Sequence, residues 1–395
     1  MNKYKYYFDR LSIFIFSIIG TIISSFIKCD ENRILFNSFQ NKKYNSNSKY
    51  LFLWFIENVK NYNSYFVVND NKLRKELNDC LGNYFVETKT FKGKIFALQA
   101  KVWVVSALEM PVGCLFAKSK RYVIHLGHGT PLKKIGLLEN KISLGKKIYY
   151  ALLKTNISYT LSPSTFFQPI LAQFLDLPLD AVLIAGQARN DQLFIKPNFN
   201  INKLTKKPGM KNILYAPTWR PTTKLLLFPF NDFSSQGLGD FLTNNDINIF
   251  LRLHPNFESE VDAELLNIKN IYLFSGTVYD EIIDFLNIFD LLITDYSSIC
   301  FDYLLLDRPM IFLPYDYESY NTEIGFTVPY NDFTPGYKPL NMKDFMKSIL
   351  DSFNETTDIY SRERKKVNGI CNSFRNNNRE EFVKLLYGRN ILKKY

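Results

Sequence analysis

The sequence has little histidine and little cysteine. It contains three histidines, His125, His128 and His254, which are too few to predict a histidine-based metal centre. Its five cysteines are odd in number, scattered, and form no Cys-x-x-Cys pair, so they predict neither a disulfide framework nor a zinc site. This cysteine usage is typical of a reducing cytosol, and we expect the protein to bind no metal.

The sequence also lacks an arginine-rich arm and the aromatic signature of RNA-binding domains. It nevertheless carries 49 Lys and Arg against 38 Asp and Glu, a net charge of +11. Such an excess suits nucleic acid, anionic lipid or phosphate-bearing substrates, and it also fits an ordinary solvated surface. Because the nucleic-acid signatures are absent, we expect no nucleic-acid partner and favour lipid and phosphate.

Apolar and aromatic residues, in contrast, are plentiful. Hydrophobic residues make up 46% of the 395 residues and aromatic residues 16%, which is ample for a globular interior. One hydrophobic core rarely organises a chain of this length, so we expect two domains.

Short apolar runs alternate with longer segments of helical spacing along both halves of the chain. The runs predicted to be strands are 33–39, 65–69, 101–107, 121–126, 157–162 and 181–185, and then 213–216, 247–253, 271–274, 291–294 and 309–313. Their content of Val, Ile, Phe and Tyr is typical of parallel sheets buried on both faces. Between Asn190 and Lys211 the chain is rich in Asn, Lys and Pro, as linkers are. We therefore predict two Rossmann-like domains of the α/β class, over 31–195 and 208–395, the second with C-terminal helices.

Two doubly wound domains that face each other leave a cleft between the carboxyl ends of their strands. This is the GT-B architecture of nucleotide-dependent glycosyl and glycosyl-phosphate transferases. Residues that follow the predicted strands are therefore the candidates for chemistry.

Ser297 and Ser298 follow the predicted strand 291–294 and precede a segment of helical spacing. Free backbone N–H groups at a helix N-terminus, together with two hydroxyls, would attract an anion such as a diphosphate. The alternative is that these residues only cap the helix. Asp302, one turn further on, would cap the helix, orient the serines or bind a hydroxyl of the ligand.

His128 lies between Gly127 and Gly129, where the predicted strand 121–126 leads into a helix whose first turn would suit Pro131. On the cleft side of such a turn, an imidazole can accept a hydroxyl proton as a general base. A structural histidine is the alternative.

Three further groups stand at the ends of predicted strands. His254 would contact phosphate or act as an acid, and the alternative is a buried core histidine. Arg189 would bind phosphate through two hydrogen bonds or form a salt bridge in the linker. A turn at Pro217 and Thr218 closes another strand.

Five of these segments occur in one order. They are His-Gly-Thr-Pro-Leu-Lys (128–133), Gly-x-x-Arg-Asn-Asp (186–191), Tyr-Ala-Pro-Thr-Trp-Arg (215–220), Arg-Leu-His-Pro (252–255) and Thr-Asp-Tyr-Ser-Ser-x-x-Phe-Asp (294–302). Together they resemble the CDP-glycerol glycerophosphotransferase family, which includes teichoic acid primases and polymerases and related capsule polymerases. The resemblance extends from Ile34 to Gly336 and departs from the family pattern at Gly127, where a Trp is usual.

The resemblance implies a GT-B fold and transfer of a polyol phosphate from CDP-glycerol or a similar CDP-polyol. The acceptor would be a hydroxyl of a cell-envelope glycan or a lipid-linked acceptor, and CMP would be released. It also implies that His128 and His254 are catalytic, with His128 as the general base. The residues that it assigns to the donor site are Gly129, Thr130, Pro131, Leu132, Arg189, Pro217, Thr218, Ser297, Ser298 and Asp302. The CDP-polyol is then a substrate, and we expect no cofactor and no metal.

An uncharged apolar segment from Leu11 to Ile27 follows three basic residues. It is shorter than the about 20 residues of a standard membrane span. A span with the positive charges inside would place the rest of the chain outside, away from a nucleotide donor. We therefore expect residues 1–30 to form a membrane-associating helix in the cytoplasmic leaflet, with a true span and a buried domain helix as alternatives. The protein would be peripheral or monotopic at the cytoplasmic face of the cell membrane.

Other functions are compatible with these motifs. CDP-ribitol is an alternative donor within the same family, and a nucleotide sugar would make the protein an ordinary GT-B glycosyltransferase. A non-catalytic module that holds an anionic polymer on a basic surface is an alternative of a different class, although it would not need two histidines on strand-end turns. A primase and a polymerase fit the motifs equally well.

Overall fold

The structure is a computed structural model that describes residues 17–197, 199, 201, 204–205, 209–220, 225–253, 258, 263–354 and 356–393. The chain divides into two compact units. Unit 1 comprises the described residues up to His128, Gly136–Asp191 and the stretch that begins at Ser373, and unit 2 comprises Gly129–Ile135 and Gln192–Asn372.

Unit 1 contains a seven-stranded sheet in the order β3-β2-β1-β4-β5-β6-β7. Its strands are β1 (Asp30–Asn37), β2 (Asn63–Val67), β3 (Phe85–Val86), β4 (Ala100–Val105), β5 (Tyr122–His125), β6 (Tyr159–Ser162) and β7 (Val182–Ile184). All neighbouring strands are parallel. The six strands predicted for this half are confirmed. The two-residue β3 was missed because a strand that short has no periodicity to detect.

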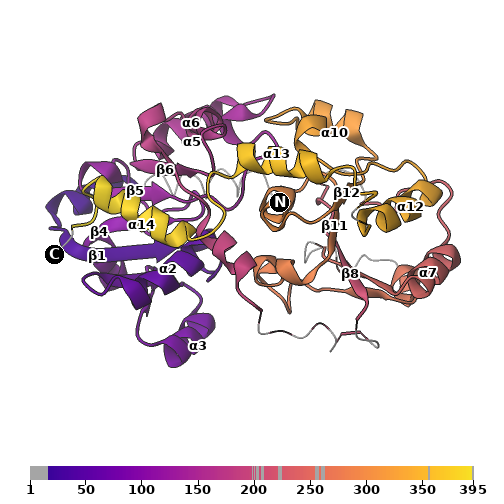
Figure 1. The fold of residues 1–395 in the computed structure, drawn as a ribbon. Helices are drawn as coiled ribbons and strands as arrows, with labels where there is room; N and C mark the ends of the chain where they lie inside the picture. Colours follow the sequence, from indigo (N-terminus) through magenta and orange to yellow (C-terminus); the bar gives the residue numbers. More distant parts are fainter. Residues whose placement is uncertain are drawn as a thin grey trace. The chain divides into compact units, whose positions relative to one another are not determined.

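Helices cover this sheet on both faces (Figure 1). The α-helices of unit 1 are α2 (Ser46–Asn58), α3 (Asn71–Leu81), α4 (Phe91–Leu98), α5 (Leu144–Leu153), α6 (Gln168–Leu175) and α14 (Asn378–Gly388). Successive strand residues alternate between two core clusters: Phe36 lies in one, whereas Leu35 and Trp103 lie in the other. All three side chains are fully buried, as expected for a parallel sheet covered on both sides.

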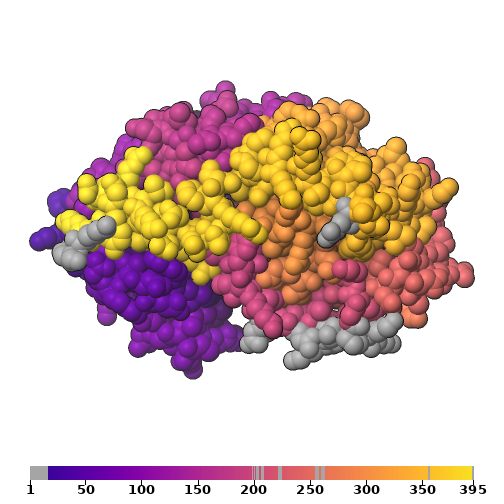
Figure 2. Space-filling model, in the orientation of Figure 1, coloured from indigo at the N-terminus to yellow at the C-terminus, as the bar shows by residue number. Residues whose placement is uncertain are grey.

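The C-terminal helix α14 belongs to unit 1, not to the second domain that was predicted to end at residue 395. Phe382 and Leu386 lie in the same core cluster as Phe52 of α2. Figure 1 shows α14 beside α2, and Figure 2 shows the yellow C-terminal residues against the indigo N-terminal part of the unit. This assignment depends on packing between residues more than 300 positions apart, which local sequence patterns do not record.

Residues 17–26 form a helix before β1, and the earlier part of the predicted apolar segment, 11–16, lies outside the described residues. One face of this helix packs on unit 1, where Ile23 contacts a core cluster. The Lys120 ammonium donates to the carbonyls of Ser24 and Ile27, so a cation caps the C-terminal end of the helix.

The other face of this helix is apolar and exposed. The exposed fractions of its large side chains are 41% for Ile18, 46% for Ile19, 57% for Ile22 and 87% for Phe26. Among the described residues, none of the helices combines the length and apolarity needed to cross a membrane.

Unit 2 contains a five-stranded parallel sheet in the order β10-β9-β8-β11-β12. Its strands are β8 (Lys211–Tyr215), β9 (Ile247–Leu251), β10 (Ile271–Leu273), β11 (Leu291–Thr294) and β12 (Met310–Phe312). Its α-helices are α7 (Ser235–Asn244), α8 (Ala263–Asn267), α9 (Ile299–Tyr303), α10 (Tyr317–Glu323), α11 (Tyr330–Phe333), α12 (Met342–Ser352) and α13 (Ser361–Cys371). All five predicted strands of this half are confirmed, so the chain has an α/β fold with two parallel sheets.

The segment Gly129–Ile135 is part of unit 2, although the prediction placed it in the first domain. Lys133 forms an antiparallel bridge with Phe326, and Thr327 N donates to Leu132 O at 3.0 Å. The helix predicted to begin at Pro131 is therefore wrong. The segment is extended instead, and its backbone N–H and C=O groups form hydrogen bonds with the backbone of residues 325–327.

Candidate active site

The strand order of each sheet reverses at one place, between β1 and β4 in unit 1 and between β8 and β11 in unit 2. In doubly wound sheets, ligands bind outside the carboxyl ends of the strands at this switch point. The loops at these two edges contain most of the residues that the sequence singled out.

In unit 1, a buried amide joins three loops at the carboxyl edge of the sheet. Asn47, in the first turn of α2, donates from Nδ2 to Gly127 O at 3.0 Å. Its Oδ1 accepts from Arg189 N at 3.1 Å, and the residue is only 1% exposed. The side chain of Asn47 therefore fixes the backbone beside His128 and at Arg189 relative to α2.

His128 lies on the surface of this edge, with its ring 5.2 Å from the ring of Phe39 in an edge-to-face arrangement. The glycines on either side have positive φ angles, +66° for Gly127 and +157° for Gly129. A side chain at Gly127 would be strained in this left-handed conformation, so this turn favours glycine. The predicted tight turn at His128 is confirmed, and its imidazole is exposed.

His125, three residues earlier, has a different environment. It ends β5, is 4% exposed, and its Nδ1 lies 2.9 Å from Thr160 Oγ1. Burial, aided by the nearby His128, lowers the pKa of His125 to about 3. His125 is thus a neutral core histidine, whereas His128 is open to solvent.

Three of the residues assigned to the donor site are buried in unit 2. Thr130 and Leu132 are each 1% exposed, and Pro131 is also buried. The Thr327 hydroxyl donates to Pro131 O at 2.5 Å. The described contacts of this segment anchor it to unit 2, and contact of its side chains with a donor stays a prediction.

In unit 2, Ser297 and Ser298 lie at the start of α9, as predicted. Both are partly exposed, and Ser298 makes no side-chain capping hydrogen bond. Ile299 N approaches Ser297 Oγ only at 3.5 Å, the limit of a hydrogen bond. The alternative that these serines serve as helix caps therefore has weak support.

The other predicted residues of unit 2 lie at the same edge. Thr218 is 8% exposed, its neighbour Pro217 is partly exposed, and both follow β8. Asp302 is 3% exposed inside α9, which fits support of the serine turn better than direct contact with a ligand. The predicted catalytic residue His254 lies outside the described residues.

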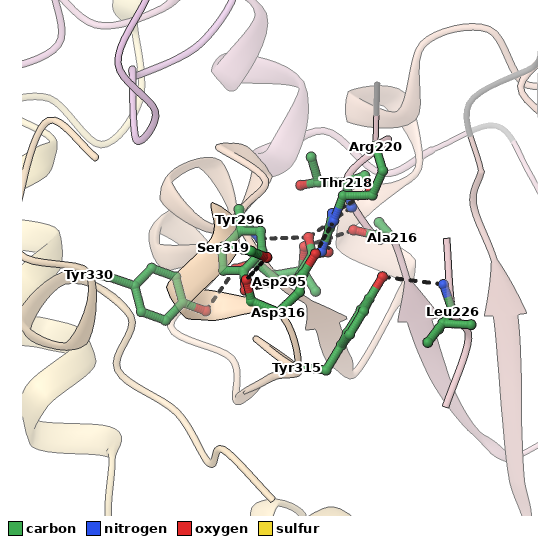
Figure 3. A network of polar contacts seen from close by, with 11 residues as sticks. Ala216, Thr218, Arg220, Leu226, Asp295, Tyr296, Tyr315, Asp316, Ser319 and Tyr330 are labelled. Atoms are coloured by element: carbon green, nitrogen blue, oxygen red, sulfur yellow. Dashed lines mark hydrogen bonds and ion pairs between the residues drawn. The ribbon is translucent and has the colours of Figure 1, made fainter. Parts of the chain in front are cut away.

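The edge also contains a buried ionic network that the sequence did not predict (Figure 3). Asp295 and Arg220 form an ion pair at 2.9 Å, and both side chains are 2% exposed. Arg220 also binds Asp316 through two hydrogen bonds, of 2.7 and 2.9 Å. The sequence did carry a signal, since Arg220 and Asp295 stand within two of the quoted motifs, in the loop after β8 and directly after β11.

The carboxylates of this network favour the protonated forms of the neighbouring basic side chains. Burial alone would lower the pKa of Arg220, but hydrogen bonds to Asp316 and the charge of Asp295 raise it above its ordinary value. Burial lowers the pKa of Lys133, and the charge of Asp295 opposes this shift. Arg220 therefore stays protonated at any physiological pH.

Within the part of the chain that the structure describes, no group of three or more His, Cys, Asp or Glu residues could hold a metal ion. The expectation that the protein needs no cofactor stays a prediction.

The chain is similar to enzymes of teichoic acid synthesis. The teichoic acid glycerol-phosphate transferase of Staphylococcus aureus is 29% identical over 345 residues, covering 82% of this chain and 86% of that protein. The teichoic acid poly(glycerol phosphate) polymerase of Bacillus spizizenii is 27% identical over 351 residues, covering 85% of this chain and 86% of that protein.

A solved structure of the wall teichoic acid polymerase TagF, soaked with CDPG, has the same fold. Its TM-score is 0.73 at 22% sequence identity, covering 92% of this chain and 90% of that chain.

Residues 21–386 match the family model described as CDP-glycerol:poly(glycerophosphate) glycerophosphotransferase, a span that includes both sheets and every motif segment named above. The chain belongs to this family.

Proposed function

We propose that the protein transfers glycerol phosphate from CDP-glycerol to a hydroxyl of a cell-envelope glycan or lipid-linked acceptor, with release of CMP. Its family and its teichoic acid relatives support this reaction. The structural observation that carries it is the edge of unit 2, where the Thr218 turn and the Ser297–Ser298 turn meet at the switch point between β8 and β11. Doubly wound sheets bind nucleotides at this place.

In this proposal the donor diphosphate binds at the start of α9. Backbone N–H groups of a helix N-terminus and the hydroxyls of Ser297 and Ser298 supply hydrogen-bond donors for it. Arg189 and His254 would neutralise charge on the phosphates, and Asp302 would support the serine turn.

His128 is the proposed general base. The acceptor oxygen forms a bond to the β-phosphorus of the donor while its proton passes to the His128 imidazole, and the bond from this phosphorus to CMP breaks. The GT-B arrangement predicted from the sequence is part of this proposal. Positioning and preformed hydrogen-bond donors would supply most of the rate enhancement.

Turnover assays test the reaction. Purified protein with a lipid-linked acceptor should release CMP from CDP-glycerol, and the length of the product would distinguish a primase from a polymerase. Parallel assays with CDP-ribitol and a UDP-sugar separate the alternatives. Release of UDP from the UDP-sugar, or no release of CMP from CDP-glycerol, would contradict the proposal.

The helix at residues 17–26 is the proposed membrane contact. Its apolar face exposes Ile22 and Phe26 to solvent while its opposite face packs on unit 1, the geometry of a helix that lies in the plane of a membrane surface. The positive net charge would favour anionic lipid.

Flotation with vesicles that contain anionic lipid tests this contact. Replacing Phe26, which is 87% exposed, by Glu should reduce the bound fraction several-fold, because it adds a charge to the apolar face without disturbing the core. Phe91, which is 68% exposed on α4, gives a matched control as Phe91→Glu. Equal binding of both variants and the unaltered protein would remove the support for a membrane role of this helix.

A further inference from the structure

A single carboxylate joins the two loops at the switch point of unit 2. Asp295 Oδ1 accepts from Thr218 N at 2.8 Å, in the loop after β8, and from Tyr296 N at 2.5 Å, in the loop after β11. Its Oδ2 lies 2.9 Å from Arg220 Nη1. Asp295 is only 2% exposed, so water does not compete for these contacts.

Arg220 extends the connection to a third strand. Its guanidinium donates to both oxygens of Asp316, which follows β12, and to Thr218 O at 2.7 Å. The Tyr296 hydroxyl donates to Asp316 at 2.9 Å (Figure 3). The guanidinium carbon also lies 5.0 Å from the ring centroid of Tyr320, within the range of a cation–π contact.

The network also reaches a fourth segment through a backbone contact. The hydroxyl of Tyr330, in α11, donates to Asp295 O at 2.9 Å (Figure 3). Both the side chain and the main chain of Asp295 are therefore held, which restricts the backbone two residues before Ser297.

The charges of this cluster are balanced. Arg220 and Lys133 are cations, Asp295 and Asp316 are anions, and Lys133 lies close enough to interact electrostatically with Asp295 and Arg220. A rigid cluster without excess negative charge can stand beside a diphosphate without repelling it.

We infer that Asp295 and Arg220 are positioning residues for the donor, which hold the Thr218 turn and the Ser297–Ser298 turn in the geometry that binds a CDP-polyol. This inference rests on the proposed function, because it assumes that the donor binds at the edge of unit 2. Neither residue is exposed enough to serve as a ligand contact itself.

The role inferred for Arg220 depends on the planar shape of its guanidinium group as well as on its charge. A planar fork spans two carboxylates and a carbonyl at fixed angles, whereas a lysine ammonium at the same position carries the charge without the fork. Arg220→Lys should therefore preserve the charge of the cluster and loosen the two turns.

Unit 2 offers a matched control for this variant. Arg364, in α13, is as buried as Arg220, with 3% against 4% exposure. It also forms two hydrogen bonds with one aspartate, of 2.9 and 2.6 Å to Asp358. It belongs to a helix well separated in sequence from both turns, so Arg364→Lys reports the cost of losing a buried arginine fork elsewhere in the same unit.

The test measures the Kd of CDP-glycerol and the melting temperature of both variants. Both should lower the melting temperature, but Arg220→Lys alone should raise the Kd at least tenfold, and its kcat at saturating donor should change less than threefold. Equal Kd values for the two variants would overturn the inference and assign Arg220 a purely structural role. If the unaltered protein bound no CDP-glycerol, the proposed function would fail instead.

A milder variant keeps the test decisive if Arg220→Lys does not fold. Asp316 has a side chain that is 19% exposed, and Asp316→Asn retains one oxygen acceptor while weakening the fork. A three- to tenfold rise in the Kd of CDP-glycerol is expected. An unchanged Kd for this variant would equally contradict the inference.

Discussion

The seven-stranded sheet of unit 1 and the five-stranded sheet of unit 2 each reverse their strand order once, but different groups hold the loops at the two carboxyl edges. At the edge of unit 1 the groups next to α2 are neutral: Asn47 bonds to Gly127 O and Arg189 N, and Ser48 N donates to Ser106 Oγ at 2.7 Å. The Asp191–Arg379 ion pair of this edge follows β7. At the edge of unit 2 the connecting groups are ions, with Arg220 between two aspartates. Both sets are buried, so burial alone does not explain the choice.

This difference indicates which chemical role fits each edge. Neutral hydrogen bonds of Asn47 fix the backbone beside His128 and leave its imidazole exposed. An ionic network fixes loop geometry more strongly, at the cost of desolvating its charges, which is suitable where a charged donor must be held. In the proposed function, unit 1 would contribute the general base His128 and unit 2 the donor-binding serines.

Replacement of His128 tests the first half of this comparison and should have the largest effect. His128→Ala removes the proposed base, and kcat is expected to fall by about 10²–10⁴-fold, the usual contribution of general base catalysis. The Kd of CDP-glycerol should change less than about threefold, because the proposal assigns donor binding to residues of unit 2. Steady-state CMP release and a donor-binding titration measure the two quantities.

His125→Asn is the control for that variant. His125 is buried in β5 and bonded to Thr160, so its replacement should lower stability and leave kcat within a few-fold of the unaltered value. A His128→Ala protein that is folded and still turns over at most of the normal rate would exclude His128 as the base.

Replacement of the serines at α9 tests the second half, with a smaller expected effect. Ser297→Ala and Ser298→Ala each remove one hydroxyl, and a hydrogen bond to a charged phosphate contributes about 1.5–3 kcal/mol. The Kd of CDP-glycerol should therefore rise about tenfold or more in each variant, with kcat nearly unchanged. A fall in kcat at constant Kd would reverse the division of roles between the two units.

Ser348→Ala serves as the control here. The Ser348 hydroxyl donates to the backbone oxygen of Asp344 in α12, so it lies in the same unit without belonging to the proposed phosphate site or to the network around Asp295. Its loss should leave donor affinity unchanged within experimental error.

Much of the fold could be predicted because its signal is local. The strands of both sheets are continuous apolar runs ended by turn residues, and burial on both faces leaves no room for polar alternation, as at Leu291–Thr294. The units' boundaries could not be predicted in the same way. The segment Gly129–Ile135 joins unit 2 through its bridge to Phe326, and α14 joins unit 1 through Phe382, and both are contacts between distant parts of the chain.

The candidate site residues were likewise predictable from the sequence only where the signal is local. Motif order selected Ser297, Thr218 and His128 as candidates, since each follows a strand that the sequence predicts. The pairing of Arg220 with Asp295 joins residues 75 positions apart in sequence, and nothing in either motif alone specifies it. Which residues pair in a buried network depends on how the chain folds at this edge and not on either motif alone.

The stabilities of the two units should depend on pH through two titratable groups outside the proposed sites, the buried His125 and the partly buried Lys338. Burial lowers the pKa of His125 in unit 1 to about 3, and burial lowers the pKa of Lys338 in unit 2 to about 8. Lys338 donates to Thr334 O at 2.7 Å and has no carboxylate within ion-pair distance among the described residues. In each case the unfolded chain binds the proton more tightly than the folded unit does.

The two units should therefore lose stability in different pH windows, the smallest effect predicted here. Between about pH 6.5 and 3, His125 is protonated in the unfolded state but stays neutral in the folded unit. The free energy of unfolding of unit 1 should therefore fall with the pH, by up to about 1.4 kcal/mol per pH unit. Between about pH 10.5 and 8, Lys338 gains its proton in the unfolded state before it does so in the folded unit, so the free energy of unfolding of unit 2 also falls with the pH. The total loss is smaller, because Lys338 is only partly buried. Urea unfolding followed by Trp103 in unit 1 and by Trp219 in unit 2 measures each window. His125→Asn should flatten only the acidic slope and Lys338→Met only the alkaline one, and a variant that flattens the slope of the other unit would contradict the separate assignment of these groups.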